Sequence, residues 1–258
     1  MLNFLSNIKN SIDFFLRRRI RFSRKNYCEV NQCKVDLEFS LEDEALENYL
    51  VEKYNLVDYK NNSTIGNYCQ NLYTIYFLDK FLMPSEKENM SVLDIGSKNW
   101  FYCLAEYKYF KRYCENLSLD GVEIDPYRLY SNFYNRYQLA AYYSKDLENT
   151  NYVVADFMDI SDKYDHIIWI LPFVTISRLK SWGLPDKYFI PQQMLNHAYS
   201  LLNEGGKLLI INQGDKEFAE QKKLIKNLGI EKYVSSPLPN KFFEYKKKRF
   251  ITVISKGY

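Results

Sequence analysis

Polar side chains and a glycine stand where several short apolar runs end in the second half of the sequence. The first run ends at Asp94 and Gly96, the second at Glu123 and the third at Asp156. Glycine permits a sharp strand-to-helix turn with close backbone approach to a ligand, and the free N–H groups of a following helix bind polar or anionic groups. Glu123 lies 27 positions beyond Gly96, where an acidic residue is placed to accept hydrogen bonds from ribose hydroxyls. These residues predict a nucleoside-binding site.

The apolar runs alternate with helical patterns, and this alternation identifies the elements that would position such a site. The runs are apolar throughout rather than at every second residue, which is typical of parallel strands covered on both faces. Strands are expected at 91–95, 117–124, 152–155, 166–171, 207–211 and 249–255, and helices near 98–113, 127–142, 190–203 and 216–228. The runs 240–246 and 248–255 are too close in sequence for a parallel crossover, so they predict an antiparallel hairpin.

Residues 1–88 have a different, helical pattern. Two apolar stripes at helical spacing lie within 41–83, and a polar connector over 84–90 follows them. Hydrophobic residues make up 47% of the 258 residues, which excludes wholesale disorder and allows a sizeable core. The predicted fold is α/β: a doubly wound, mostly parallel seven-stranded sheet with a C-terminal antiparallel hairpin over 89–258, preceded by a helical N-terminal extension over 1–88.

The order of the motifs resembles that of the class I, Rossmann-like, S-adenosylmethionine-dependent methyltransferases. The similar stretches are VLDIGSKNW (92–100), GVEIDPYR (121–128), ADFMDI (155–160), YDHIIWILPF (164–173) and LLNEGGKLLII (201–211). With the hairpin that follows, they cover about residues 90–258, or about two thirds of the chain. The resemblance implies a Rossmann-like methyltransferase domain over 89–258 that uses S-adenosylmethionine as its cofactor.

The cofactor-binding residues that the resemblance implies lie at or just after the ends of strands of the predicted sheet: Asp94, Gly96, Ser97, Glu123, Ile124, Asp156 and Phe157. The resemblance implies that Asp94 and Gly96 bound the methionine end of the cofactor and that Glu123 binds the ribose. It implies that Ile124, Asp156 and Phe157 surround the adenine. The Asp156 carboxylate would accept a hydrogen bond from the exocyclic amine. A structural role stays open for Asp94 and Glu123, because a carboxylate at a strand end often caps the following helix.

The glycine-rich loop departs from the family pattern. Lys98 and Trp100 stand where the family has its second and third glycine. A loop with such bulky residues either shifts the cofactor or prevents its binding. The sequence therefore leaves two interpretations: an active methyltransferase, and a catalytically inactive methyltransferase-like module for binding or scaffolding.

The residues expected on the acceptor side lie at the rim of the crevice: Trp100, Phe101, Pro172, Phe173, Asn212 and Gln213. Methyl transfer from a sulfonium needs alignment of the nucleophile with the methyl group, and it needs a base only when the acceptor is protonated. No catalytic residue is assigned, and His166 and His197 are interpreted as structural. The segment 178–193 is either a lid over the crevice mouth or packing material.

The expected partners follow from charge and from the ends of the chain. The formal net charge of +3 does not favour nucleic acid, so we expect a small molecule, a glycan or a lipid-linked intermediate as acceptor. Residues 1–25 combine a helical apolar stripe with a basic cluster, which fits either weak peripheral contact with an anionic membrane or a helix docked on the domain.

The cysteines indicate the compartment. There are five, irregularly spaced, and the pair Cys28 and Cys33 has no matching second pair. This pattern predicts reduced thiols, with neither a disulfide framework nor a metal site. We expect a cytoplasmic protein with peripheral membrane contact as a secondary feature.

Overall fold

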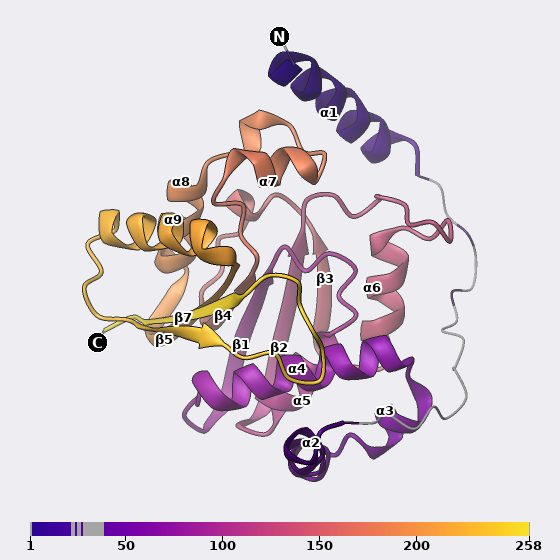
Figure 1. The fold of residues 1–258 in the computed structure, drawn as a ribbon, viewed down its shortest axis with the longest axis vertical. Helices are drawn as coiled ribbons and strands as arrows, with labels where there is room; N and C mark the ends of the chain where they lie inside the picture. The colour runs from indigo at the N-terminus through magenta and orange to yellow at the C-terminus, as the bar shows by residue number, and fades with distance from the viewer. Residues whose placement is uncertain (1, 22–23, 25–26, 28–38, 258) are drawn as a thin grey trace.

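The fold is built around one mixed sheet (Figure 1). In the computed structural model, which describes residues 2–21, 24, 27 and 39–257, seven strands lie in the order β3-β2-β1-β4-β5-β7-β6. The parallel strands are β1 (Lys87–Ile95), β2 (Cys114–Glu123), β3 (Thr150–Val154), β4 (Tyr164–Ile170) and β5 (Leu202–Gln213). β7 (Arg249–Ser255) runs antiparallel to both β5 and β6 (Val234–Leu238). The predicted doubly wound sheet with its antiparallel C-terminal hairpin is confirmed.

Helices cover both faces of the sheet, because successive residues of each apolar strand point to opposite sides. The elements on one face are α4 (Ile65–Phe81), α5 (Cys103–Lys111) and α6 (Arg136–Ser144), and those on the other are α8 (Pro191–Ser200) and α9 (Gly214–Asn227). In β1, for example, Val92 belongs to the first core and Leu93 to the second. The strand order reverses between β1 and β4, which is where open α/β sheets bind ligands.

The helical extension shares its core with the sheet. α2 (Leu41–Tyr54) and α3 (Val57–Asn62) precede α4. Leu50 of α2 and the α4 residues Leu72 and Ile75 are fully buried in one cluster with Val92 and Leu119 of the sheet. A domain boundary between residues 88 and 89 therefore stays a prediction.

The first helix packs at the edge of the molecule. α1 (Leu2–Arg19) lies against α7 (Ile176–Ser181) and η2 (Asp186–Tyr188), with Phe14 in a small core that includes Leu179 and Leu184. None of the helices in the described part of the chain combines the length and the apolar character needed to cross a bilayer. Lys25, Cys28 and Cys33 lie outside the described residues.

The strand expected over 240–246 is wrong. The hairpin partner of β7 is β6, and residues 239–248 connect the two strands. The apolar side chains that suggested a strand instead cover the sheet from this connection: Phe242 is buried, and Tyr245 packs against the same core. Pro237 is tolerated within β6 because β6 is an edge strand.

Candidate active site

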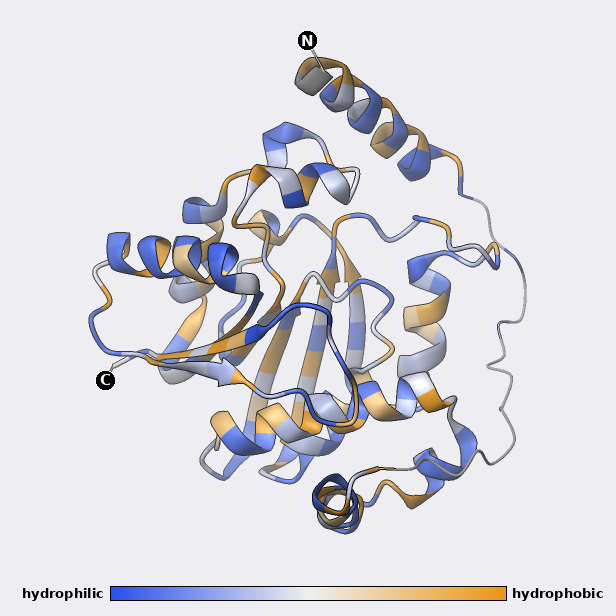
Figure 2. Ribbon diagram, in the orientation of Figure 1, coloured by the Kyte–Doolittle hydropathy of each residue, from blue (hydrophilic) through white to orange (hydrophobic). Residues whose placement is uncertain are grey.

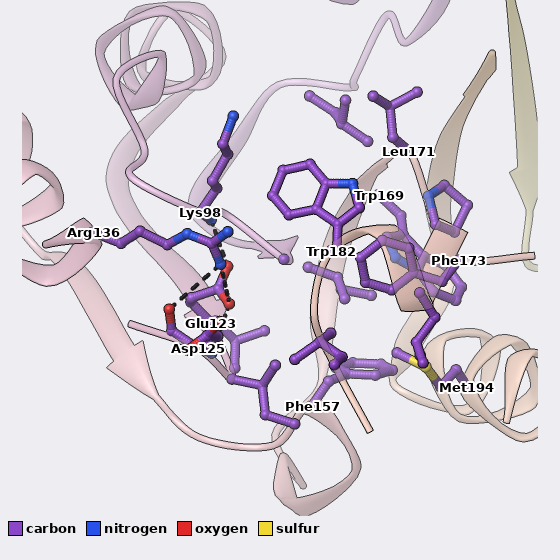
Figure 3. Close-up of a pocket in the computed structure, with 18 of the residues that line it drawn as sticks. Lys98, Glu123, Asp125, Arg136, Phe157, Trp169, Leu171, Phe173, Trp182 and Met194 are labelled. Carbon is purple, nitrogen blue, oxygen red and sulfur yellow. Dashed lines mark hydrogen bonds and ion pairs between the residues drawn. The ribbon is translucent and has the colours of Figure 1, made fainter. Parts of the chain in front are cut away.

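A cavity of about 250 Å³ lies beyond the carboxyl ends of β1 to β4. Its lining includes five of the seven residues implied for the cofactor, namely Gly96, Glu123, Ile124, Asp156 and Phe157. Three of the six residues expected on the acceptor side also line it: Phe101, Pro172 and Phe173. Figure 3 shows the end of β2 on one side of this pocket, with Phe157, Phe173 and Met194 on the other.

The other predicted site residues lie outside the pocket. Asp94 near the end of β1 and Ser97 in the loop that follows β1 are both fully buried. β5 continues to Gln213, two residues further than expected, so Asn212 is still paired with Phe250 in the sheet and is fully buried. Gln213 lies beside a separate surface hollow. The expected placement of Asn212 and Gln213 at the rim is corrected, because it assumed a shorter strand.

The loop after β1 has a backbone geometry that normally requires glycine. The φ angles of Gly96, Lys98 and Trp100 are 73°, 62° and 44°, so all three residues are in the left-handed region. Lys98 and Trp100 each carry a conformational cost of roughly 1–2 kcal/mol there. The loop is stabilised by the Lys98 N–H, which donates to Glu123 Oε2 at 2.9 Å, and by the Tyr152 hydroxyl, which donates to the Lys98 carbonyl.

Trp100 points away from the pocket, so its expected place at the acceptor rim is wrong. Its indole is fully buried, and its Nε1 donates to Glu106 Oε2 at 2.9 Å. The ring lies on Gly121 of β2, where an added Cβ would come within 2.8 Å of it. Because Gly121 has no side chain, the indole fits beneath the loop instead of inside the crevice.

Glu123 sits at the centre of a polar cluster. Oε2 accepts from the Lys98 N–H, while Oε1 accepts from the Asp125 N–H at 2.7 Å and from Arg136 Nη1 at 3.1 Å. Glu123 and Arg136 are both almost fully buried, so this is an interior ion pair (Figure 3). Burial and the neighbouring Arg136 guanidinium lower the pKa of the Lys98 amine. The sequence predicted Glu123 here but missed Arg136, because a lone arginine in a loop–helix junction carries no motif.

Two carboxyl groups share the interior behind the loop. Asp94 Oδ2 accepts from the Tyr102 hydroxyl at 2.8 Å. Burial raises the pKa of Asp94 to about 7, the Tyr102 hydrogen bond opposes this, and the Glu123 charge adds to it. Burial and the nearby Asp94 also raise the pKa of Glu106 well above its usual range. Burial therefore favours the protonated form of both carboxyl groups.

The segment with Trp182, for which the sequence left a lid and packing as alternatives, forms one wall of the pocket. Leu179, Trp182, Leu184 and Tyr188 all line it. The Trp182 ring lies 5.2 Å from Lys98 Nζ and 5.2 Å from the Arg136 guanidinium carbon, so both cations face its π system. The segment thus closes the pocket over the cluster around Glu123.

The remaining wall comes from elements that sequence reasoning did not connect with the site. Helix α4 and the β6–β7 region contribute Gln70, Tyr73, Thr74, Phe77, Tyr245 and Arg249. The Arg249 guanidinium carbon lies 3.6 Å from the Tyr245 ring centre, and its Nε is buried without a hydrogen-bond partner among the described residues. The sequence predicted an apolar helical stripe here without Tyr73 or Phe77, and only the packing of α4 on the sheet brings these two side chains to the pocket.

The two histidines lie away from this chemistry. His166, near the start of β4, is stacked on Phe110, and burial lowers its pKa to about 4. His197 Nε2 forms a hydrogen bond of 2.9 Å with the Ile160 carbonyl. Among the described residues, no three His, Cys, Asp or Glu side chains are arranged to hold a metal ion.

Comparison with solved structures identifies the architecture. A SAM-dependent methyltransferase from Aquifex aeolicus superposes with a TM-score of 0.50 at 15% sequence identity, covering 84% of this chain and 99% of that one. The chain has the class I methyltransferase fold. At this identity the likeness concerns the fold alone. No protein-family model matches the sequence, and no curated protein matches it.

Other proteins with this fold differ in what they do. The [4+2]-cyclase SpnF superposes with a TM-score of 0.51 at 9% identity, over 72% of this chain and 80% of that one. A tRNA m1G37 methyltransferase from M. jannaschii gives 0.47 at 13% identity, and the match covers 72% of this chain but only about half, 48%, of that enzyme. Because a methyltransferase and a cyclase share this fold, the fold leaves the reaction and the acceptor to be argued from the pocket itself.

Proposed function

We propose that the protein transfers a methyl group from S-adenosylmethionine to a small acceptor. The observation that carries this proposal is the convergence of the Gly96 turn, the Glu123 carboxylate and the Asp156 carboxylate on one pocket at the ends of β1, β2 and β3. A turn without a side chain, followed by acceptors for hydroxyl and amine groups, is the chemistry that an adenosyl group requires.

The residues of this pocket fit the proposed cofactor. A Cβ built on Gly96 would meet no atom within 4 Å, so the turn leaves open space beside its backbone. Asp156 Oδ1 accepts from the Met158 N–H at 3.1 Å, and Oδ2, which has no partner in the described part of the chain, is left for the adenine amine. Phe157 and Ile124 supply apolar surfaces for the ring. The bound cofactor would supply an electrophilic methyl group on a sulfonium sulfur.

The cationic groups around Glu123 suit the remaining part of the ligand. Three donors already occupy the Glu123 oxygens, which leaves room for about one further hydroxyl donor on a carboxylate with some four acceptor positions. The Lys98 side chain lines the same pocket, and we assign it to the carboxylate of the methionyl group. Trp100 motivated the inactive alternative, and its indole lies outside this space.

The proposed acceptor occupies the half of the pocket formed by α4, Phe101 and the β6–β7 region. Among the described residues of that half, none is Asp, Glu, His or Cys, and burial raises the pKa of Tyr73. With no base at neutral pH, this half favours a nucleophile that needs no deprotonation, such as a neutral amine or a carboxylate, over a sugar hydroxyl. Arg249 fits an anionic group on the acceptor. We therefore propose an anion-bearing small molecule or lipid head group as the acceptor.

Calorimetric titration with S-adenosylmethionine and S-adenosylhomocysteine tests the proposal. We expect both to bind, and we expect Asp156→Ala to weaken binding roughly tenfold through loss of a charge-assisted hydrogen bond. Asp159→Ala is the matched control, because Asp159 lies in the short helix (Phe157–Asp159) that Asp156 caps but is exposed and outside the pocket. Absence of binding by the unmodified protein, or equal affinities for the two variants, would contradict the assignment.

A further inference from the structure

Helix α1 exposes a continuous apolar face. Its large side chains on that face are 41–68% exposed, and they recur at helical spacing: Phe4, Leu5, Ile8, Ile12, Phe15 and Leu16. Ile20 continues the apolar surface just beyond the helix end. Figure 2 shows this helix at the periphery of the molecule, with apolar and polar stretches side by side. So many exposed apolar residues on one element mark an interaction surface.

The opposite face of α1 is fixed to the protein. Asn10 Nδ2 donates to the Lys180 and Leu184 carbonyls, and Asn7 Oδ1 accepts from the Asp186 N–H at 2.8 Å. Arg17 forms a two-pronged ion pair with Asp125, with both N–O distances 3.0 Å. The helix is therefore held with its apolar face pointing away from the body, so that this face is available to a partner without unfolding or rotation.

Positive charge is concentrated beside the apolar face. Residues 1–25 contain seven Lys and Arg and one acidic residue, Asp13, a formal charge of +6 (7 − 1). The whole chain carries +3, so the remaining residues sum to −3 (3 − 6). Arg18 and Arg19 are exposed, and neither forms an ion pair with an acidic residue that the structure describes. Arg19 lies 4.4 Å above the ring of Phe15, at the junction of the charged and apolar surfaces.

We propose that α1 binds the surface of an anionic lipid bilayer, with its apolar face in the acyl boundary and its arginines among the head groups. An amphipathic helix with basic residues flanking a broad apolar face lies in the plane of the interface, where burial of apolar area and attraction to anionic lipids add. A second copy of α1 would present the same positive charge, whereas anionic lipid supplies the opposite one. The proposal does not depend on methyl transfer.

Co-sedimentation of the full chain with vesicles tests the proposal. We expect binding to vesicles of phosphatidylcholine with phosphatidylglycerol, weakened by salt, and at least roughly tenfold weaker binding to phosphatidylcholine alone. Ile12→Ser with Phe15→Ser, and separately Arg18→Glu with Arg19→Glu, should each lower binding to the anionic vesicles by roughly tenfold or more.

The control removes apolar side chains of similar exposure elsewhere. Leu41 and Val234 are 87% and 65% exposed and lie on α2 and β6, so Leu41→Ser with Val234→Ser should leave vesicle binding unchanged. All the substituted residues are exposed, and circular dichroism will check that each variant is folded. Equal sedimentation with both kinds of vesicle would overturn the proposal. A dimer that the Ile12 and Phe15 substitutions dissociate, together with no vesicle binding, would overturn it too and assign the face to a second copy of the chain.

Discussion

Lys98 and Trp100 adopt backbone conformations that usually require glycine. Gly121 in the neighbouring strand β2 explains where the Trp100 side chain is accommodated. Sequence reasoning treated these side chains as obstacles inside the crevice. In the structure the indole of Trp100 is accommodated by the missing side chain of Gly121, so the space that the loop glycine would provide is found in β2 instead. A departure from a glycine pattern therefore indicates a blocked site only when no neighbouring strand offers room for the substitute.

The buried Asp94 predicts a pH dependence of stability. Its pKa of about 7 lies above the value of 3.8 for an exposed aspartate, so between these values the folded state holds a proton that the unfolded state lacks. The free energy of unfolding should then fall as pH rises through this window and level off above it. Between about pH 5 and about pH 8, the free energy of unfolding of Asp94→Asn should decrease by at least about 1 kcal/mol less than that of the unmodified protein, measured by urea denaturation. Asp159→Asn, on an exposed carboxylate, should follow the unmodified protein, and an unchanged profile for Asp94→Asn would refute the prediction.

At the scale of elements, the sequence predicted the strands better than the connections. The apolar runs located β1 to β5 and β7, since parallel strands buried on both faces have a distinct local composition. Helix α5 begins at Cys103 rather than near residue 98, because the left-handed residues of the preceding loop cannot be helical. The β6 strand was missed because it is a short edge strand that contains two serines and a proline, while the buried Phe242 made the connection look like a strand.

The acceptor side of the site could not be predicted for a related reason. Strand ends are local signals, and they located Gly96, Glu123 and Asp156 correctly beside one pocket. Helix α4 reaches the pocket only through long-range packing on α5 and the sheet, which no local pattern records. The same limit explains why the position of Arg249 in the pocket wall became evident only in the structure.

A substitution that adds one methyl group to β2 tests the contact between this strand and the β1–α5 loop. Gly121→Ala places a Cβ 2.8 Å from the indole, so it should reduce the free energy of unfolding by about 1–3 kcal/mol through overpacking. In a Trp100→Leu background the same substitution should cost at least about 1 kcal/mol less, because the clashing ring is absent. Chemical denaturation of the four proteins of this cycle gives the coupling energy.

Gly66→Ala provides the control for that cycle. Gly66 lies in α4, an added Cβ there meets no atom within 4 Å, and alanine favours a helix over glycine by about 1 kcal/mol. This variant should be as stable as the unmodified protein or more so. If Gly121→Ala were equally harmless, the indole would not be packed on β2 as described.

At the scale of the whole molecule, a chain of polar contacts joins α1 to the pocket. Arg17 binds the carboxylate of Asp125, and the Asp125 N–H donates to Glu123 in the proposed cofactor site. Arg17 also donates to the Gly183 carbonyl at 3.1 Å, next to Trp182 in the pocket wall. The helix that carries the apolar, basic surface is thus attached to both sides of the proposed ligand site.

Arg17→Ala should remove the polar contacts that attach α1 to the pocket. Asp125 is 1% exposed, and removal of its bidentate partner leaves a buried carboxylate whose remaining ion pair among the described residues is the longer one with Arg128, at 3.9 Å. We expect faster hydrogen exchange in α1 and in residues 176–190, and S-adenosylhomocysteine binding weakened roughly threefold to tenfold, or about 1 kcal/mol, as the wall and Glu123 lose their support. Arg18→Ala changes the adjacent, exposed arginine and should alter neither. Exchange confined to α1 with unchanged affinity would show that the helix is attached to the pocket without supporting it.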